Sequence, residues 1–432
     1  MTDARRGFLR NLALILWAVA LCTVCVRVTV QTHHKQSGYE VYYKAGMHWR
    51  HGEHLYRHPD DYAHVYVPPD QRQPGRPNIA WGGFRYLPVT AIAFVPLSYL
   101  PMAVGEVVWR VFLAALSLGA LWWCCRLGLP RPLARRDWPI IFLLVLFAFT
   151  GCLNNGQSSC IVIGCMLAAI ACVTTERWTL AALCMACATL LKIYPLSLGL
   201  LLAVAWPRRF AWRYALMLAL GLALPFLLRP GAWIMEEHRR WLWHLLNDAI
   251  QPETIHQWDH DVRLLLVRVA HLRLSPHAFV AIELAAGALI GAVCIGGIRA
   301  RWSTRRLLTR MLGLSVCWMT VLGQATEPST YVLVAPTLAW AMWESTLRPH
   351  TRFARASRVV LFTSYALFIT AYVALWFPKG KQINGVGLEP LAGVLLFGYL
   401  LVECARDLIP RAGGRQAESL RTSASVARAA RP

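Results

Sequence analysis

Apolar and polar positions alternate in long blocks along this chain. Apolar runs of about 15 to 25 residues recur from Leu12 to Cys404, separated by polar gaps. A run of that length crosses a bilayer as a helix, because a helix satisfies all of its backbone hydrogen bonds internally. Strands of a membrane barrel would be shorter and would alternate in polarity. The pattern therefore predicts an all-α integral membrane protein, a polytopic bundle with about twelve transmembrane helices.

Two long polar segments, residues 31–101 and 229–276, interrupt the bundle. The first closes with an apolar stretch containing Pro88 and Pro96, which predicts a short re-entrant or interfacial segment rather than a span. The second contains the sequence RRWLWHLL, which is typical of a helix lying on a membrane surface. We expect both segments to be loops that carry short interfacial helices.

A charged residue and a proline interrupt the apolar run 178–206. Lys192 and Pro195 lie in its middle, where neither suits a straight spanning helix. The run therefore predicts two short helices that meet at an apex.

Composition and charge fix the expected orientation. The chain of 432 residues is 57% hydrophobic, 15% charged and has a formal net charge of +22. Its arginines gather in alternate short gaps at 131–136, 208–213, 299–310 and 348–358, which is the asymmetry of cytoplasmic loops. The positive charge therefore indicates membrane orientation and not a nucleic-acid partner. Both termini are predicted to be cytoplasmic, and the two long polar segments are predicted on the outer face of a bacterial inner membrane.

The ends of the chain carry two further expectations. Arg5, Arg6 and Arg10 precede the first apolar run without a small-residue cleavage site after it, which predicts a retained anchor. Residues 1–405 are expected to form one transmembrane domain, and the basic tail 406–432 is expected to be disordered. Most of the 13 cysteines lie inside apolar runs, so we expect small buried side chains with no metal and no cofactor.

Polar residues concentrate in the outer segments and at the outer ends of helices. A transporter usually keeps its polar residues near the middle of the membrane. The distribution instead favours an enzyme that acts at the outer interface on a lipid-linked substrate.

Several motifs resemble those of one known family. They are GYEVYYKAGMHWRHGEHLY, GFRYLPVTAIAFVPLSYLP, NNGQSS, LLKIYPLSL, IHQWDHDVRLLLVRV and, more weakly, EPSTYVLVAP. In order and spacing they are similar to the membrane glycosyltransferases of family 87, polyprenyl-phosphate-mannose-dependent mannosyltransferases of the GT-C superfamily. The resemblance implies an inverting transfer of a hexose, expected to be mannose, from a polyprenyl-phosphate donor to a glycolipid, glycan or protein acceptor.

The resemblance also implies a carboxylate base, and here the chain departs from the family. The family pattern D-F-x-V-Y-Y-x-A places its aspartate where this chain has Gly38. Glu40, two positions later, is the nearest acid and our candidate for the base that accepts the proton of the acceptor hydroxyl. Rival acids are Glu53, Asp60, Asp61, Glu236 and Glu237.

The departing phosphate needs a cation, and the sugars need polar and aromatic neighbours. The candidate phosphate ligands are Lys192, Arg85 and Arg263. The candidate substrate-binding residues are Tyr42, Tyr43, Tyr86, Asn155, Gln157, Gln257 and Glu327. Each of them has an ordinary alternative role: snorkelling for the lysine, contact with lipid head groups for the arginines, an aromatic belt for the tyrosines and turn formation for Asn155 and Gln157.

Two other functions stay open at this point. A transporter or flippase would move a lipid-linked sugar without forming a bond, although the chain shows no internal repeat. A degenerate, non-catalytic relative that binds polyprenyl phosphate would account for the glycine at position 38.

Overall fold

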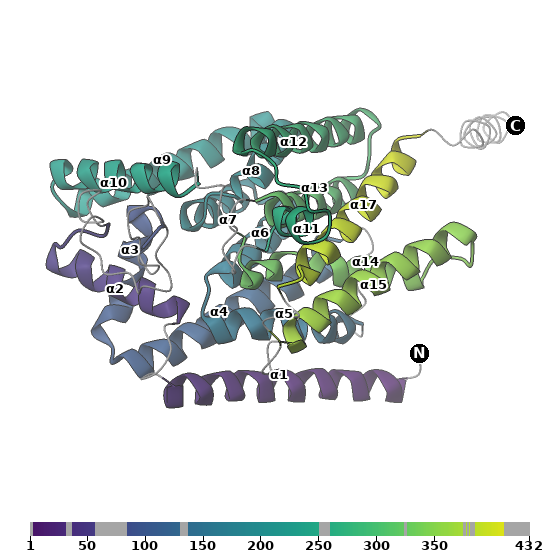
Figure 1. Ribbon diagram of the computed structural model, residues 1–432, viewed down its shortest axis with the longest axis horizontal. Coiled ribbons are helices and arrows are strands. Elements are labelled where there is room, and N and C mark those ends of the chain that lie inside the picture. The colour runs from purple at the N-terminus through teal and green to yellow at the C-terminus, as the bar shows by residue number, and fades with distance from the viewer. Residues whose placement is uncertain are drawn as a thin grey trace, which may run out of the picture.

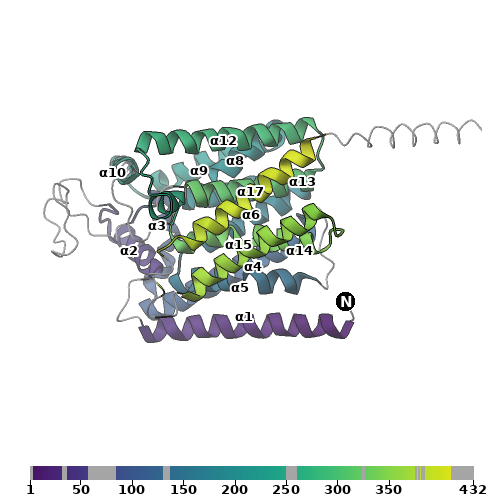
Figure 2. The same cartoon turned by 45° about the vertical axis from the view of Figure 1, so that its right-hand side comes forward.

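The computed structural model describes residues 3–31, 37–56, 84–129, 137–249, 260–323, 326–374, 377, 380 and 385–409. Every regular element in these segments is a helix, which confirms the predicted all-α class. Long helices lie side by side, with α1 on one side of the bundle and α12 on the other (Figures 1 and 2).

Most helices extend along the length of the bundle. They are α1 (Asp3–Gln31), α4 (Met102–Leu127), α5 (Trp138–Asn155), α6 (Ser159–Thr174), α7 (Trp178–Leu191), α8 (Leu196–Ala205), α9 (Trp212–Leu228), α12 (Pro276–Arg299), α13 (Thr304–Cys317), α14 (Ala335–Thr346), α15 (Arg352–Ala374) and α17 (Leu388–Leu408). Helix α6 packs between α4 and α7 and is buried on almost all sides. Helices α9 and α12 instead expose apolar side chains, as lipid-facing helices do.

Seven of the described helices are long and apolar enough to cross a membrane, judged by length and composition. They comprise segments of α1, α4, α5, α12, α15 and α17, together with α9 and the π-turn η4 (Pro207–Ala211) before it. Helices α6, α7 and α8 are apolar but shorter. The predicted number of about twelve includes these shorter helices and the broken segments formed by α13 and α14 with the turns η5 (Trp318–Leu322) and η6 (Pro328–Leu333).

Helices outside the main bundle gather at one of its ends, which we call the α2 end. They are α2 (Gly38–His51), α3 (Pro88–Phe94), η3 (Pro96–Tyr99), α10 (Gly231–Ala249) and α11 (Val262–Arg268). Figure 2 shows α2, α3 and α10 at this end and the N-terminus at the other, which we call the opposite end. The apolar stretch that contains Pro88 and Pro96 forms the two short helices α3 and η3 and not one long span, and its re-entrant or interfacial position stays a prediction.

The predicted break at Lys192 is also present. Helix α7 ends at Leu191, Lys192 is extended with φ −145° and ψ 137°, and α8 begins at Leu196. Pro195 has no N–H to donate and would collide with the carbonyl group four residues earlier, so the helix cannot continue. The C-terminal tail 410–432 lies outside the described residues, and the division into domain and tail stays a prediction.

Candidate active site at the α2 end

Helix α2 is fixed at both ends by local sequence. The hydroxyl of Ser37 accepts a hydrogen bond from the Glu40 N–H at 3.4 Å, and Gly52 closes the helix in the left-handed region at φ 76°. Between them, Tyr39, Tyr42 and Trp49 lie on the buried face, at helical spacing. One face of α2 therefore packs into the bundle, and another face points outward.

Tyr42 links three segments. Its hydroxyl lies 2.8 Å from the hydroxyl of Tyr86 and 2.7 Å from that of Ser158, at the start of α6. Its ring stacks on Phe94 with centroids 4.5 Å apart. Burial raises the pKa of the Tyr42 phenol well above its ordinary value, so this group is a neutral hydrogen-bonding hydroxyl at physiological pH.

Lys192 lies next to these hydroxyl groups. Its ammonium donates to Ser159 at 3.0 Å, and it lies 5.7 Å from the ring centroid of Tyr194. Glu327 accepts a hydrogen bond of 2.8 Å from the side-chain amide of Gln157, which is two residues before Ser159.

These residues form what we call the lysine cluster: Tyr42, Tyr86, Gln157, Ser158, Ser159, Lys192, Tyr194 and Glu327. The buried Oε1 of Gln157 has no hydrogen-bond partner among the described residues. A buried polar atom without a partner costs about 1–3 kcal/mol, so it is expected where a ligand completes the bonding.

A buried ion pair supports the turn between α5 and α6. Glu106 and Arg110 on α4 pair with each other, and Glu106 also accepts from the hydroxyl of Ser37. The guanidinium of Arg110 lies against Gly156, where a Cβ would fall 2.5 Å from its Cζ. Gly156 has φ +70°, so both its conformation and the lack of space favour glycine.

The carboxylate that contacts the residue before position 38 is that of Glu106, which belongs to α4 and not to α2. Gly38 packs against the same turn, and a Cβ there would lie 3.0 Å from the carbonyl oxygen of Asn155. Glu106 reaches the neighbouring Ser37 from α4. Glu106 and Arg110 are not among the predicted site residues, although opposite charges four residues apart inside an apolar run are a signal of a buried pair that the sequence contains.

Glu40 lies on a different face of α2 from Tyr42. It pairs with Lys44 at 2.7 Å and lines an open pocket of about 420 Å³ together with Glu106 and Tyr43. The hydroxyl of Tyr43 donates to the carbonyl of Leu100 at 3.4 Å. The structure therefore places Glu40 and Tyr43 in this pocket, whereas Lys192 and Glu327 belong to the lysine cluster, which Tyr42 joins from the buried face of α2.

The two candidate arginines lie in different segments of the chain, Arg85 just before α3 and Arg263 in α11. Arg263 binds Asp261, with 3.0 Å between Nε and Oδ2, and lies 4.9 Å from the ring centroid of Phe279. Arg85 is exposed beside Tyr86, and Asn155 is exposed at the end of α5. Gln257, like Asp60 and Asp61, lies outside the described residues.

The three described rival acids have local partners. An oxygen of Glu53 lies 3.7 Å from the Nε2 of His48. Glu237 is fully buried and accepts from the N–H of Leu55 at 2.9 Å, so it ties the end of the α2 segment to α10. Glu236 pairs with Arg240 one turn later at 2.8 Å.

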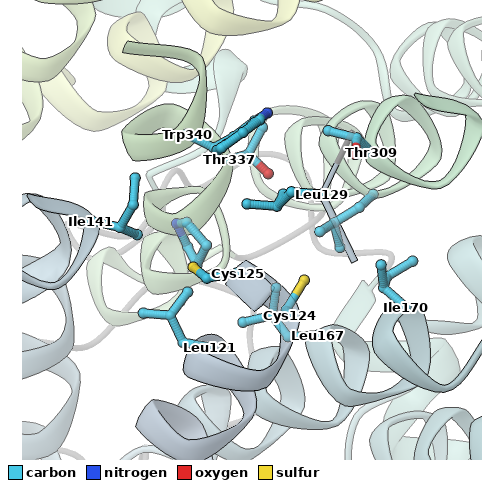
Figure 3. Close-up of a pocket in the computed structure, with 12 residues that line it drawn as sticks. Leu121, Cys124, Cys125, Leu129, Ile141, Leu167, Ile170, Thr309, Thr337 and Trp340 are labelled. Atoms are coloured by element: carbon cyan, nitrogen blue, oxygen red, sulfur yellow. The ribbon is translucent and has the colours of Figure 1, made fainter. Parts of the chain in front are cut away.

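A second cavity, toward the opposite end, is too small for a sugar. Its volume is about 20 Å³, enough for one water molecule, and its lining includes Leu121, Cys124 and Trp340 (Figure 3). The polar pocket and the lysine cluster therefore make the α2 end the candidate active site.

The model for glycosyltransferase family 87 matches residues 84–324, more than half of the chain. The chain belongs to glycosyltransferase family 87. It is thus related to membrane enzymes that transfer sugars, and the predicted family is confirmed. No sequence among curated proteins matches it.

In this family 87 glycosyltransferase, the segment 84–324 that matches the family includes Lys192, Gln157, Glu106 and Arg110. This segment begins after α2 and ends before Glu327. The roles of Glu40 and Glu327 therefore stay predictions, as do those of the other candidate residues.

Proposed function

We propose that this protein transfers a hexose, with mannose expected, from a polyprenyl-phosphate donor to an acceptor, with inversion at the sugar carbon. The α2 end would face the outer side of a bacterial inner membrane, in a GT-C-type arrangement. The observation that carries the proposal is the lysine cluster, which joins one partly buried cation to several hydroxyls at the end of an apolar bundle. The described arginine-rich segments between α12 and α13 and between α14 and α15 lie at the opposite end (Figure 2), which supports the orientation.

The cluster suits a departing phosphate monoester. Lys192 supplies positive charge close to the apolar bundle, while Ser159 and Tyr86 supply hydroxyls that donate to phosphate oxygens. In the transfer, the acceptor oxygen forms a bond to the anomeric carbon as the bond from that carbon to the phosphate oxygen breaks. The electron pair leaves with the phosphate, and a carboxylate takes the acceptor proton.

Two carboxylates compete for the role of base. Glu40 is our proposed base and faces the open pocket, in which an acceptor has room to enter. Glu327 is the alternative, because it lies in the lysine cluster itself, hydrogen-bonded to Gln157. The variants Glu40→Gln and Glu327→Gln are compared in membranes supplied with polyprenyl-phosphate-mannose. The variant that removes the base should lower the rate of mannose transfer by about 100-fold or more, and the other variant should not.

Replacement of Lys192 tests the function. With radiolabelled polyprenyl-phosphate-mannose and native membranes, Lys192→Met should lower transfer by about 100-fold, because the leaving phosphate loses its cation, and Lys192→Arg should retain part of the rate. The matched control is Arg268→Met, which removes an exposed cation from α11 at the same end. Equal rates for wild type and Lys192→Met, at equal protein levels, would reject the phosphate site. Donor binding without any transfer by the wild type would indicate a degenerate relative instead.

A further inference from the structure

The open pocket on the outward face of α2 has a mixed lining that favours a particular class of ligand. Ser37, Glu40, Tyr43, Lys44, Met47 and His48 contribute from the α2 side, and Met102 and Glu106 from α4. The α2 positions recur at three- and four-residue spacing, so they form one helix face. A volume of about 420 Å³ lies in the range of small-molecule sites.

Each carboxylate of the pocket already has a cation. Glu40 pairs with Lys44 at 2.7 Å, and Glu106, which is 3% exposed, pairs with the fully buried Arg110. The pocket therefore combines carboxylate oxygens, which accept hydrogen bonds, with a balanced charge. An anion would face two carboxylates, and a metal cation would have to compete with Lys44 and Arg110 for them.

Apolar surface lies beside these acceptors. Met47 and Met102 are partly buried, and the ring of Tyr43 is held by the bond from its hydroxyl to the Leu100 carbonyl. A sugar ring has hydroxyl donors at its edge and an apolar C–H face. Pockets that bind such ligands combine apolar and aromatic walls with a few placed polar groups.

We propose that this pocket binds a neutral sugar ring, the hydroxyl-rich part of the acceptor. The role as acceptor rests on the proposed glycosyl transfer, whereas the binding of a neutral sugar does not. Glu106 then acts as a binding and positioning residue, since Ser37 and Arg110 hold it rigidly at the pocket wall.

Protection of an introduced cysteine tests the binding. In the full-length protein, Met47→Cys is labelled with a hydrophilic maleimide, and the rate is compared with that of unmodified protein to subtract its native cysteines. The probes are methyl α-mannoside, methyl α-glucoside and methyl α-galactoside as neutral sugars, glucose 1-phosphate as an anion, and MgCl2 as a cation. We expect at least one neutral sugar to slow labelling several-fold, with little effect of the charged probes.

A second pair of variants separates pocket binding from general effects. His51→Cys, exposed on α2 outside the pocket, should show no protection. Adding Met102→Trp to Met47→Cys fills the pocket and should abolish protection. Labelling slowed by none of the neutral sugars, or only by the ions, would overturn the inference. Protection without glycosyl transfer would reject the proposed function alone, and transfer without protection would reject the pocket alone.

Discussion

Glu106 at the α2 end and Glu403 at the opposite end are both buried carboxylates paired with arginine, but their surroundings differ. Glu106 has one cationic partner, Arg110, which is itself fully buried. Glu403 accepts two hydrogen bonds of 2.8 Å from Arg348 and also pairs with Arg310 and Arg406. Its network is shared, and Arg406 is half exposed.

The difference shows what each end is built to do. A shared network at a half-exposed surface tolerates the loss of one member, since the remaining arginines still neutralise the acid. A single pair in the apolar interior does not, because either partner alone would be an uncompensated buried charge. The Glu106–Arg110 pair also holds the glycine turn and the start of α2, and therefore the walls of the candidate site.

Removal of Arg110 should have the largest effect. Arg110→Met leaves Glu106 buried without a cation and should lower the free energy of unfolding by about 3–5 kcal/mol. Thermal or denaturant unfolding in detergent micelles measures the loss. The double variant Glu106→Met with Arg110→Met should recover most of the stability, because it removes both charges. A double variant as unstable as the single one would show that packing and not charge carries the effect.

The matching change at the opposite end should cost less. Arg348→Met removes two hydrogen bonds, but Arg310 and Arg406 still pair with Glu403, so we expect a loss of roughly 1–2 kcal/mol in the same assay. Equal losses for Arg348→Met and Arg110→Met would contradict the contrast between the two ends.

The smallest effect is expected at Tyr42. Tyr42→Phe removes the hydroxyl that meets Tyr86 and Ser158, at a cost of about 1 kcal/mol at neutral pH. Because burial raises the pKa of Tyr42 in the folded state, its contribution is present below pH of about 10 and is lost as the pH rises above that value. The stability difference between wild type and Tyr42→Phe should therefore shrink between about pH 10 and 11. A difference that widens over that range would contradict the assigned direction.

Sequence alone gave the class of the protein and several local features. Apolar length predicts spanning helices because the bilayer leaves the backbone few alternatives, and Pro195 predicts the break after α7 because proline lacks an N–H. Lys192 was identifiable as a candidate because a lysine inside an apolar run needs a partner or water. The family motifs added the expected reaction.

Tertiary structure decided which of these residues meet. Glu40 and Tyr42 are two positions apart and therefore lie on different faces of α2. Glu40 lines the open pocket, and Tyr42 belongs to the lysine cluster. Gln157 and Glu327 are 170 positions apart and yet are hydrogen-bonded. Glu106 stands beside Ser37 only because α4 packs against the start of α2. Composition and periodicity indicate whether a segment faces lipid, water or protein. Contacts across the bundle depend on how the helices pack, and a local sequence pattern does not determine that packing.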